Sequence, residues 1–85
     1  MSSSVGKLRV DATLDLRGLQ PPEGYHAAVK QLQGMAEQEI LELHLDEEAM
    51  QTVPFGLRAE GHEIVVSEPA SAGIRLLVRK RAPIA

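Results

Sequence analysis

The stretch LDLRGLQPPEG, residues 14–24, contains the change of pattern from which the fold is predicted. Leu14 and Leu16 alternate with charged residues, which is typical of a strand with one apolar face. The glycine that follows ends the alternation. Pro21 and Pro22 then mark the start of a helix, because a first helical turn has no intrahelical partner for the N–H that proline lacks. The stretch therefore predicts a strand, from about residue 12, that leads directly into a helix.

The helix is predicted from the spacing of apolar residues after Glu23. They recur at steps of three and four, which gives an amphipathic helix of about 14 residues. Its apolar positions are Tyr25, Ala28, Val29, Leu32 and Met35. Tyr25 is accordingly predicted to be a core residue, as is Phe55 in the second helix.

The remaining elements follow in the order strand, helix, strand, strand. They are predicted as a strand over residues 39–45, a helix from near Pro54 to a stop at Gly61 after the acidic Glu47-Glu48, and strands over residues 62–67 and 73–80. Residues 68–72 are a turn-forming stretch of hairpin length, so the last two strands should pair antiparallel. Alternation in the earlier strand separates Leu41, Leu43 and Leu45 from its polar side.

This order, β-α-β-α-β-β, predicts an α+β fold. We expect a two-layer α/β sandwich with a mixed four-stranded sheet, parallel first strands and two helices on one face. A single domain should cover residues 7–81, between a disordered tail over 1–6 and a short tail over 82–85. The open face of the sheet is predicted to carry Thr13, Asp15, Arg17, Ile40, Glu42, His44, Glu63, Val65, Ser67, Arg75, Leu77 and Arg79. Its apolar members are either scattered or a small patch for self-association, so the chain is expected to be a monomer or a weak homodimer.

Composition excludes several kinds of chemistry. The chain has no cysteine, which removes disulfides, thiolate catalysis and Cys-based metal sites. Its 9 Lys+Arg against 12 Asp+Glu give a net charge of −3, so it has no overall attraction for nucleic acid. No apolar run predicts a membrane span or a signal peptide, and a cytoplasmic location is expected.

With the motifs laid out in this way, the sequence resembles the TusA/SirA-like family of small sulfur-carrier proteins, which have the same order of elements. In that family the first strand is followed by Gly-Leu-x-Cys-Pro-x-Pro, and Gly18-Leu19 matches its beginning. An ungapped register over about residues 13–80 also matches Asp46, Val53-Pro54 and Gly61-His62 to the family's aspartate, Ile-Pro and Gly-His.

The resemblance also shows what is missing. The register places Pro21 at the carrier cysteine, so the site that it implies has no nucleophile. We describe this degenerate carrier site by its residues Gln20, Pro21, Pro22, Glu23 and Gly24. Two prolines remove two backbone donors from the helix start and Glu23 adds a negative charge, so the site is ill-suited to a persulfide anion. An uncharacterised group within the family has Pro-Pro-Glu where carriers have Cys-Pro-Glu, and this sequence resembles that group.

A second departure concerns the connection after the first helix. Carriers usually have a glycine there, and the register places Gln38 at that position. A left-handed backbone at Gln38 would cost about 1 kcal/mol relative to glycine. The sequence favours the alternative, in which Gly34 ends the helix with a positive φ.

Other polar residues are weaker candidates for a site. His26, His44 and His62 have no metal-binding spacing, and His62 after Gly61 is expected to finish a helix end. The acidic residues Asp46, Glu47, Glu48 and Glu60 are typical of a solvated helix opening rather than of an acid/base pair. The basic C-terminal strand carries a possible interaction surface, namely Arg75, Arg79, Lys80 and Arg81.

Two hypotheses for function follow. The first is a non-enzymatic protein-binding or regulatory module of TusA-like fold, without persulfide-carrier activity, cofactor or metal, and linked to sulfur-relay partners such as a cysteine desulfurase. The alternative is a nucleic-acid or acidic-ligand binder that uses the basic C-terminal strand. The fold is also similar to the C-terminal domain of the third translation initiation factor, which supports the alternative by analogy alone.

Overall fold

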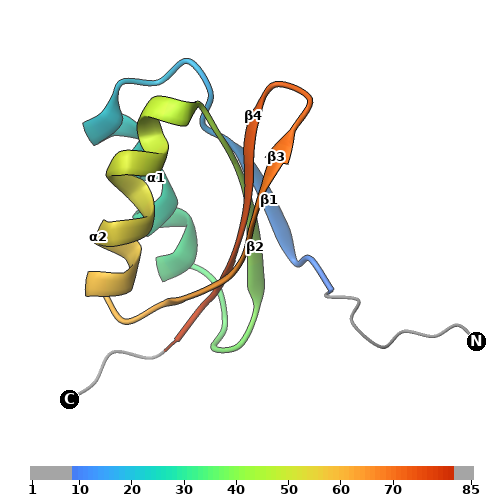
Figure 1. Ribbon diagram of the computed structural model, residues 1–85. Coiled ribbons are helices and arrows are strands. Elements are labelled where there is room, and N and C mark those ends of the chain that lie inside the picture. Colours follow the sequence, from blue (N-terminus) through green and yellow to red (C-terminus); the bar gives the residue numbers. More distant parts are fainter. Residues whose placement is uncertain (1–8, 82–85) are drawn as a thin grey trace, which may run out of the picture.

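The computed structural model describes residues 9–81 and places one layer of helices against one sheet (Figure 1). The elements are β1 (Ala12–Asp15), α1 (Pro21–Gln33), β2 (Ile40–Leu45), the 3-10 helix η1 (Glu47–Gln51), α2 (Val53–Ala59), β3 (Glu63–Ala70) and β4 (Gly73–Arg79). This confirms the α+β fold and the order of elements that the sequence predicts. The tails predicted for residues 1–6 and 82–85 lie outside the described residues.

The sheet has the strand order β1-β2-β4-β3. β1 is parallel to β2, while the pairs β2–β4 and β3–β4 are antiparallel. A short β-α-β crossover produces the parallel pair, and the hairpin of β3 and β4 completes the mixed sheet. Both α-helices lie on the same face of this sheet, as Figure 1 shows.

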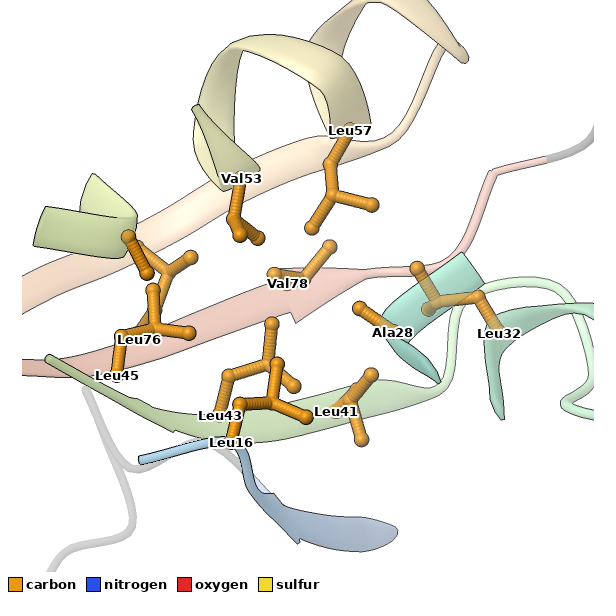
Figure 2. Close-up of a cluster of buried hydrophobic side chains, with 11 residues drawn as sticks. Leu16, Ala28, Leu32, Leu41, Leu43, Leu45, Val53, Leu57, Leu76 and Val78 are labelled. Carbon is orange, nitrogen blue, oxygen red and sulfur yellow. The ribbon is translucent and has the colours of Figure 1, made fainter. Parts of the chain in front are cut away.

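The core lies between the two layers. Alternation along β2 directs Leu41, Leu43 and Leu45 toward the helices, where each is fully buried. They meet Leu76 and Val78 of β4 and side chains of α1 and α2 (Figure 2). The same period-two pattern that predicts the strand therefore also selects its buried face.

The second helix of the prediction is divided in the structure. The acidic opening forms η1, and α2 begins at Val53 after Thr52. Val53 and Leu57, four residues apart, are both fully buried. They are one turn apart on a helix of seven residues, so this helix has only one narrow apolar stripe.

The β3–β4 hairpin is tighter than predicted. β3 continues to Ala70, and the turn is reduced to Ser71 and Ala72. Pro69 pairs with Ile74 within the ladder, which is possible because β3 is an edge strand. The prediction that residues 68–72 are all turn is therefore wrong.

A bulge changes the faces of β3. The register shifts between Ile64 and Val66, so Val66 and Glu68 lie opposite the open-face residues Leu77 and Arg75. The sequence places Val65 and Ser67 there, which is wrong by one residue because a bulge inserts an extra residue into one strand.

Within residues 9–81, the open face of the sheet has no exposed apolar patch of the predicted kind. Ile40 and Leu77 are only 4% and 3% exposed. Their cross-strand partners are Arg79 and Glu42, which are charged and long enough to cover them. These two residues therefore do not supply the surface for self-association that the sequence left open.

The connection from α1 to β2 contains one residue with a left-handed backbone, and it is not the residue that the sequence favours. α1 ends at Gln33 and Gly34 caps it, as predicted, but Gly34 has a φ of −89°. The positive φ, 79°, belongs to Gln38. The N–H of Gln38 donates to the carbonyl oxygen of Lys80 at 2.7 Å, and this bond to the end of β4 holds the residue in place.

Replacement of Gln38 by glycine is expected to stabilise the fold by about 1 kcal/mol, because glycine adopts a left-handed backbone without the steric cost of a Cβ atom. Urea unfolding followed by circular dichroism measures the change. Gly34→Ala is the matched control, since Gly34 has an ordinary helical φ and its alanine variant gains nothing from a positive φ. An unchanged or lower midpoint for Gln38→Gly would contradict the expectation.

Candidate functional site

The degenerate carrier site lies at the start of α1. Gln20 is the N-cap residue, with no hydrogen bond from its side chain to the helix, and Pro21 and Pro22 begin the first turn. The N–H of Gly24 donates to the carbonyl oxygen of Gln20 at 3.0 Å. The N–H of Glu23 is then the one donor left in this turn, and the same residue adds a negative charge to it. Such a helix start is a poor anion site.

The loop before α1 is held by Asp46. The N–H of Gly18 donates to Oδ2 of Asp46 at 2.8 Å, while the carbonyl oxygen of Asp46 accepts the N–H of Ala49 at 3.0 Å. One residue therefore fixes both the β1–α1 loop and the start of η1. The sequence register finds Asp46, but only the structure shows the contact with Gly18.

A second set of contacts joins this corner to the hairpin. The Arg17 guanidinium donates to both carboxylate oxygens of Asp15, at 2.9 and 2.8 Å, and to the carbonyl oxygen of Ala72 at 3.2 Å. The same guanidinium holds the pKa of Asp15 well below its ordinary value. Arg17 thus connects the end of β1 to the β3–β4 turn.

An apolar depression lies beside the degenerate carrier site, between α1 and α2. Its lining consists of Pro22, Tyr25, His26, Thr52 and Gly56. A Cβ atom at Gly56 would come within 2.4 Å of the Tyr25 ring, so a side chain at this position would force the ring to move. The Tyr25 hydroxyl donates to Oε2 of Glu60 at 3.1 Å, and partial burial raises its pKa.

Two large apolar side chains of the described residues are exposed, and each neighbours this region in the chain: Phe55 precedes Gly56, and Leu19 precedes the degenerate carrier site. Phe55 is 65% exposed and Leu19 is 42% exposed. The prediction that Phe55 is a core residue is wrong, because α2 is short and its Val53 and Leu57 take the buried stripe. We use the name α1–α2 surface for the depression residues Pro22, Tyr25 and Gly56 together with their exposed neighbours in the chain, Leu19 and Phe55.

Three acidic residues are close in sequence to the residues of this surface. Glu23 belongs to the first turn of α1, and Glu47 and Glu48 begin η1, directly before α2. All three are exposed, and within residues 9–81 none of them takes part in a salt bridge. This corner therefore combines exposed apolar side chains with unneutralised negative charge.

The basic C-terminal strand has a different character. Each of its four cations is engaged within the protein: Arg75 with Glu42 and Glu68, Arg79 and Arg81 with Glu63, and Lys80 with the carbonyl oxygen of Leu32. The Arg75 guanidinium lowers the pKa of Glu42. Binding of phosphate by this strand would require these pairs to break, which weakens the nucleic-acid alternative.

The three histidines lie on three different parts of the fold. His26 lies on α1, His44 on the open face of β2, and His62 between α2 and β3. Over residues 9–81 the structure has no group of three His, Asp or Glu side chains that could hold a metal ion. The same part of the chain has no helix long and apolar enough to span a membrane.

These features define a class of protein before any comparison: a small two-layer α/β domain whose distinctive surface lies at the start of its first helix. The sequence matches the family model described as Sulfurtransferase TusA over residues 12–80. Since the match covers most of the chain, the protein belongs to the TusA family. No curated protein gives a significant match. Members of the family are sulfur carriers rather than catalysts, and this member has no cysteine.

Proposed function

We propose that this TusA-family protein is a non-enzymatic binding or regulatory module that docks on a sulfur-relay protein in the cytoplasm without carrying sulfur itself. The observation that carries the proposal is the pairing of Pro21, at the carrier position, with the exposed α1–α2 surface beside it. The family's chemistry needs a thiol at this position, whereas docking needs only the surface around it.

The absence of carrier activity follows from the residues at the helix start. Thiolate or persulfide chemistry requires a nucleophilic sulfur, and the chain has none. The one remaining donor of the first turn, the N–H of Glu23, is opposed by the Glu23 carboxylate. The site therefore lacks the atom that carries sulfur, and its two prolines reduce the number of donors that would stabilise the charge of a persulfide.

Docking is supported by the composition of the α1–α2 surface. Exposed aromatic side chains such as Phe55 are the type that most often dominates binding energy when a partner buries them. The carboxylates of Glu23, Glu47 and Glu48 favour a partner with a basic rim around an apolar centre. We therefore expect the partner to be a relay protein of the kind that receives family carriers.

Replacement of Phe55 by aspartate tests the proposal. We expect the variant to bind purified cysteine desulfurase at least thirtyfold more weakly than the wild type, because loss of a buried aromatic anchor costs about 2 kcal/mol or more. Isothermal calorimetry measures the affinities. Phe55 is exposed, so the substitution should leave the core, and hence the unfolding midpoint, nearly unchanged.

The matched control is Ser71→Asp, which adds the same charge at the exposed β3–β4 turn. It should bind as the wild type does. The proposal is rejected if the wild type gives no heat of binding with the desulfurase and a pull-down from native lysate recovers no sulfur-pathway protein. Equal weakening by both variants would reject the α1–α2 surface as the docking site.

A further inference from the structure

His62 connects the end of α2 to the chain that follows β4. Its N–H donates to the carbonyl oxygen of Leu57 at 3.1 Å, which fixes its backbone to the helix. Its ring nitrogen Nδ1 accepts the N–H of Arg81, also at 3.1 Å. Arg81 lies two residues beyond the last residue of β4, so this bond extends the chain's attachment past the end of the strand.

This hydrogen bond exists in only one protonation state of the ring. A nitrogen that accepts an N–H carries no hydrogen, so the imidazole is neutral and its proton is on Nε2. Protonation would place an N–H at Nδ1, facing the N–H of Arg81. Two donors cannot bond to each other, and the contact would open.

The surroundings of the ring favour the neutral form. His62 borders a small pocket, whose other lining residues are Val29, Gln33, Glu60, Lys80 and Arg81. Burial is the main cause that lowers the pKa of His62; the Lys80 charge lowers it further, and the Glu60 carboxylate opposes both. β3 contributes Glu63, which is paired with Arg81, whereas the α1 residues at the pocket are uncharged.

We infer that His62 is a pH-sensitive latch that fastens the chain at Arg81 to the α2–β3 junction and releases it when the ring is protonated. Protonation of His62 should free the backbone of Arg81 but leave the preceding residues of the chain attached. Lys80 is held independently, because its N–H donates to Glu39 at 2.8 Å and its carbonyl oxygen accepts from Gln38 at 2.7 Å. The remaining tie of Arg81, its guanidinium to Glu63 at 3.2 Å, is an exposed ion pair and contributes little.

The sign of the pH dependence follows from the lowered pKa. The latch is fully closed above the ordinary histidine pKa of 6.5. As the pH falls below this value, the unfolded chain binds a proton that the latched state resists, so the latch loses stability until the lower pKa of the folded state is reached. Below that value both states carry the proton, so no further loss occurs.

Amide exchange at Arg81 tests the latch in the intact wild-type protein. After correction for intrinsic rates, we expect its protection to fall at least about tenfold between about pH 8 and pH 5, tracking the NMR titration of the His62 ring. The amide of Lys80 should stay protected. An Arg81 amide that remains protected through the His62 midpoint would overturn the inference.

His62→Asn provides the second arm. The asparagine Oδ1 can accept the same N–H but does not titrate, so protection of Arg81 should become independent of pH. His26→Asn, on the exposed side of α1, should leave the wild-type profile unchanged. Loss of protection at the same pH in His62→Asn would assign the change to another group and refute the latch.

Discussion

Replacement of Gly73 by alanine is expected to lower the free energy of unfolding by about 3 kcal/mol or more. A Cβ atom at Gly73 would lie 2.2 Å from the carbonyl oxygen of Leu45, and the residue has a φ of 108°. The obstacle is backbone rather than a flexible side chain. Leu45 is also paired with Ile74, so it cannot move away without disturbing the β2–β4 ladder.

Thermal and urea unfolding by circular dichroism measure this loss, which corresponds to a fall in Tm of about 12 °C or more for a domain of this size. Gly61→Ala is the matched control. Gly61 also has a positive φ, 99°, but no atom lies within 4 Å of the position that its Cβ would take. Gly61→Ala should therefore show only the conformational cost, about 1 kcal/mol. Equal losses in the two variants would show that the contact with Leu45 is not the cause.

The layers of the fold could be predicted because their signals are local. Alternation along β2 selects Leu41, Leu43 and Leu45 for the core, and the two prolines mark the start of α1. Each of these signals comes from residues close together in the sequence, within a single strand or at the start of a single helix. The structure confirms both predictions, because the contacts between the sheet and the helices bury the same residues that the local pattern selects.

The errors have a common physical origin, because they involve choices between residues of similar type. Val65 and Val66 are both apolar, so alternation cannot show which of them the bulge displaces. Phe55 is an apolar residue of the type usually found in a core. In the short helix α2, however, the buried core positions are occupied by Val53 and Leu57, and Phe55 lies outside them. Likewise, Gly34 is available for a left-handed turn, but the bond to Lys80 imposes that conformation on Gln38.

The candidate site was predictable in part. The family register locates Pro21 and Asp46, and the structure confirms the fold on which that register depends. The exposed α1–α2 surface could not be found, because it depends on how two helices approach over Gly56. Similarly, the pairing of Arg75 with Glu42 requires β2 beside β4, and the sequence does not determine strand order.

Replacement of Pro21 by cysteine is expected to give the protein a reactive thiol and the ability to take up sulfur. The substitution restores an N–H at the first helical position and places sulfur at the positive end of the α1 dipole, which lowers a thiol pKa below its ordinary value of about 8.5. Pro22 does not prevent this, since the carrier pattern has a proline at the same position. Glu23 opposes the thiolate but leaves the backbone donors in place.

The sulfur transfer itself is a thiol exchange. The new thiolate attacks the terminal sulfur of a desulfurase persulfide, the sulfur–sulfur bond breaks, and the desulfurase thiolate leaves. Intact mass spectrometry after incubation with desulfurase and cysteine should show the gain of one sulfur atom, and reducing agent should remove it. Because the wild type has no cysteine, the variant reports on a single thiol.

Gln33→Cys is the matched control, since it places an exposed thiol at the opposite end of the same helix, where the dipole disfavours the thiolate. We expect Pro21→Cys to react with iodoacetamide at neutral pH several times faster, with a thiol pKa lower by about one unit. Equal thiol pKa values would show that the start of α1 no longer stabilises an anion. A low pKa without sulfur uptake would instead place the defect in docking, and the Phe55→Asp comparison would then decide whether the desulfurase recognises this surface at all.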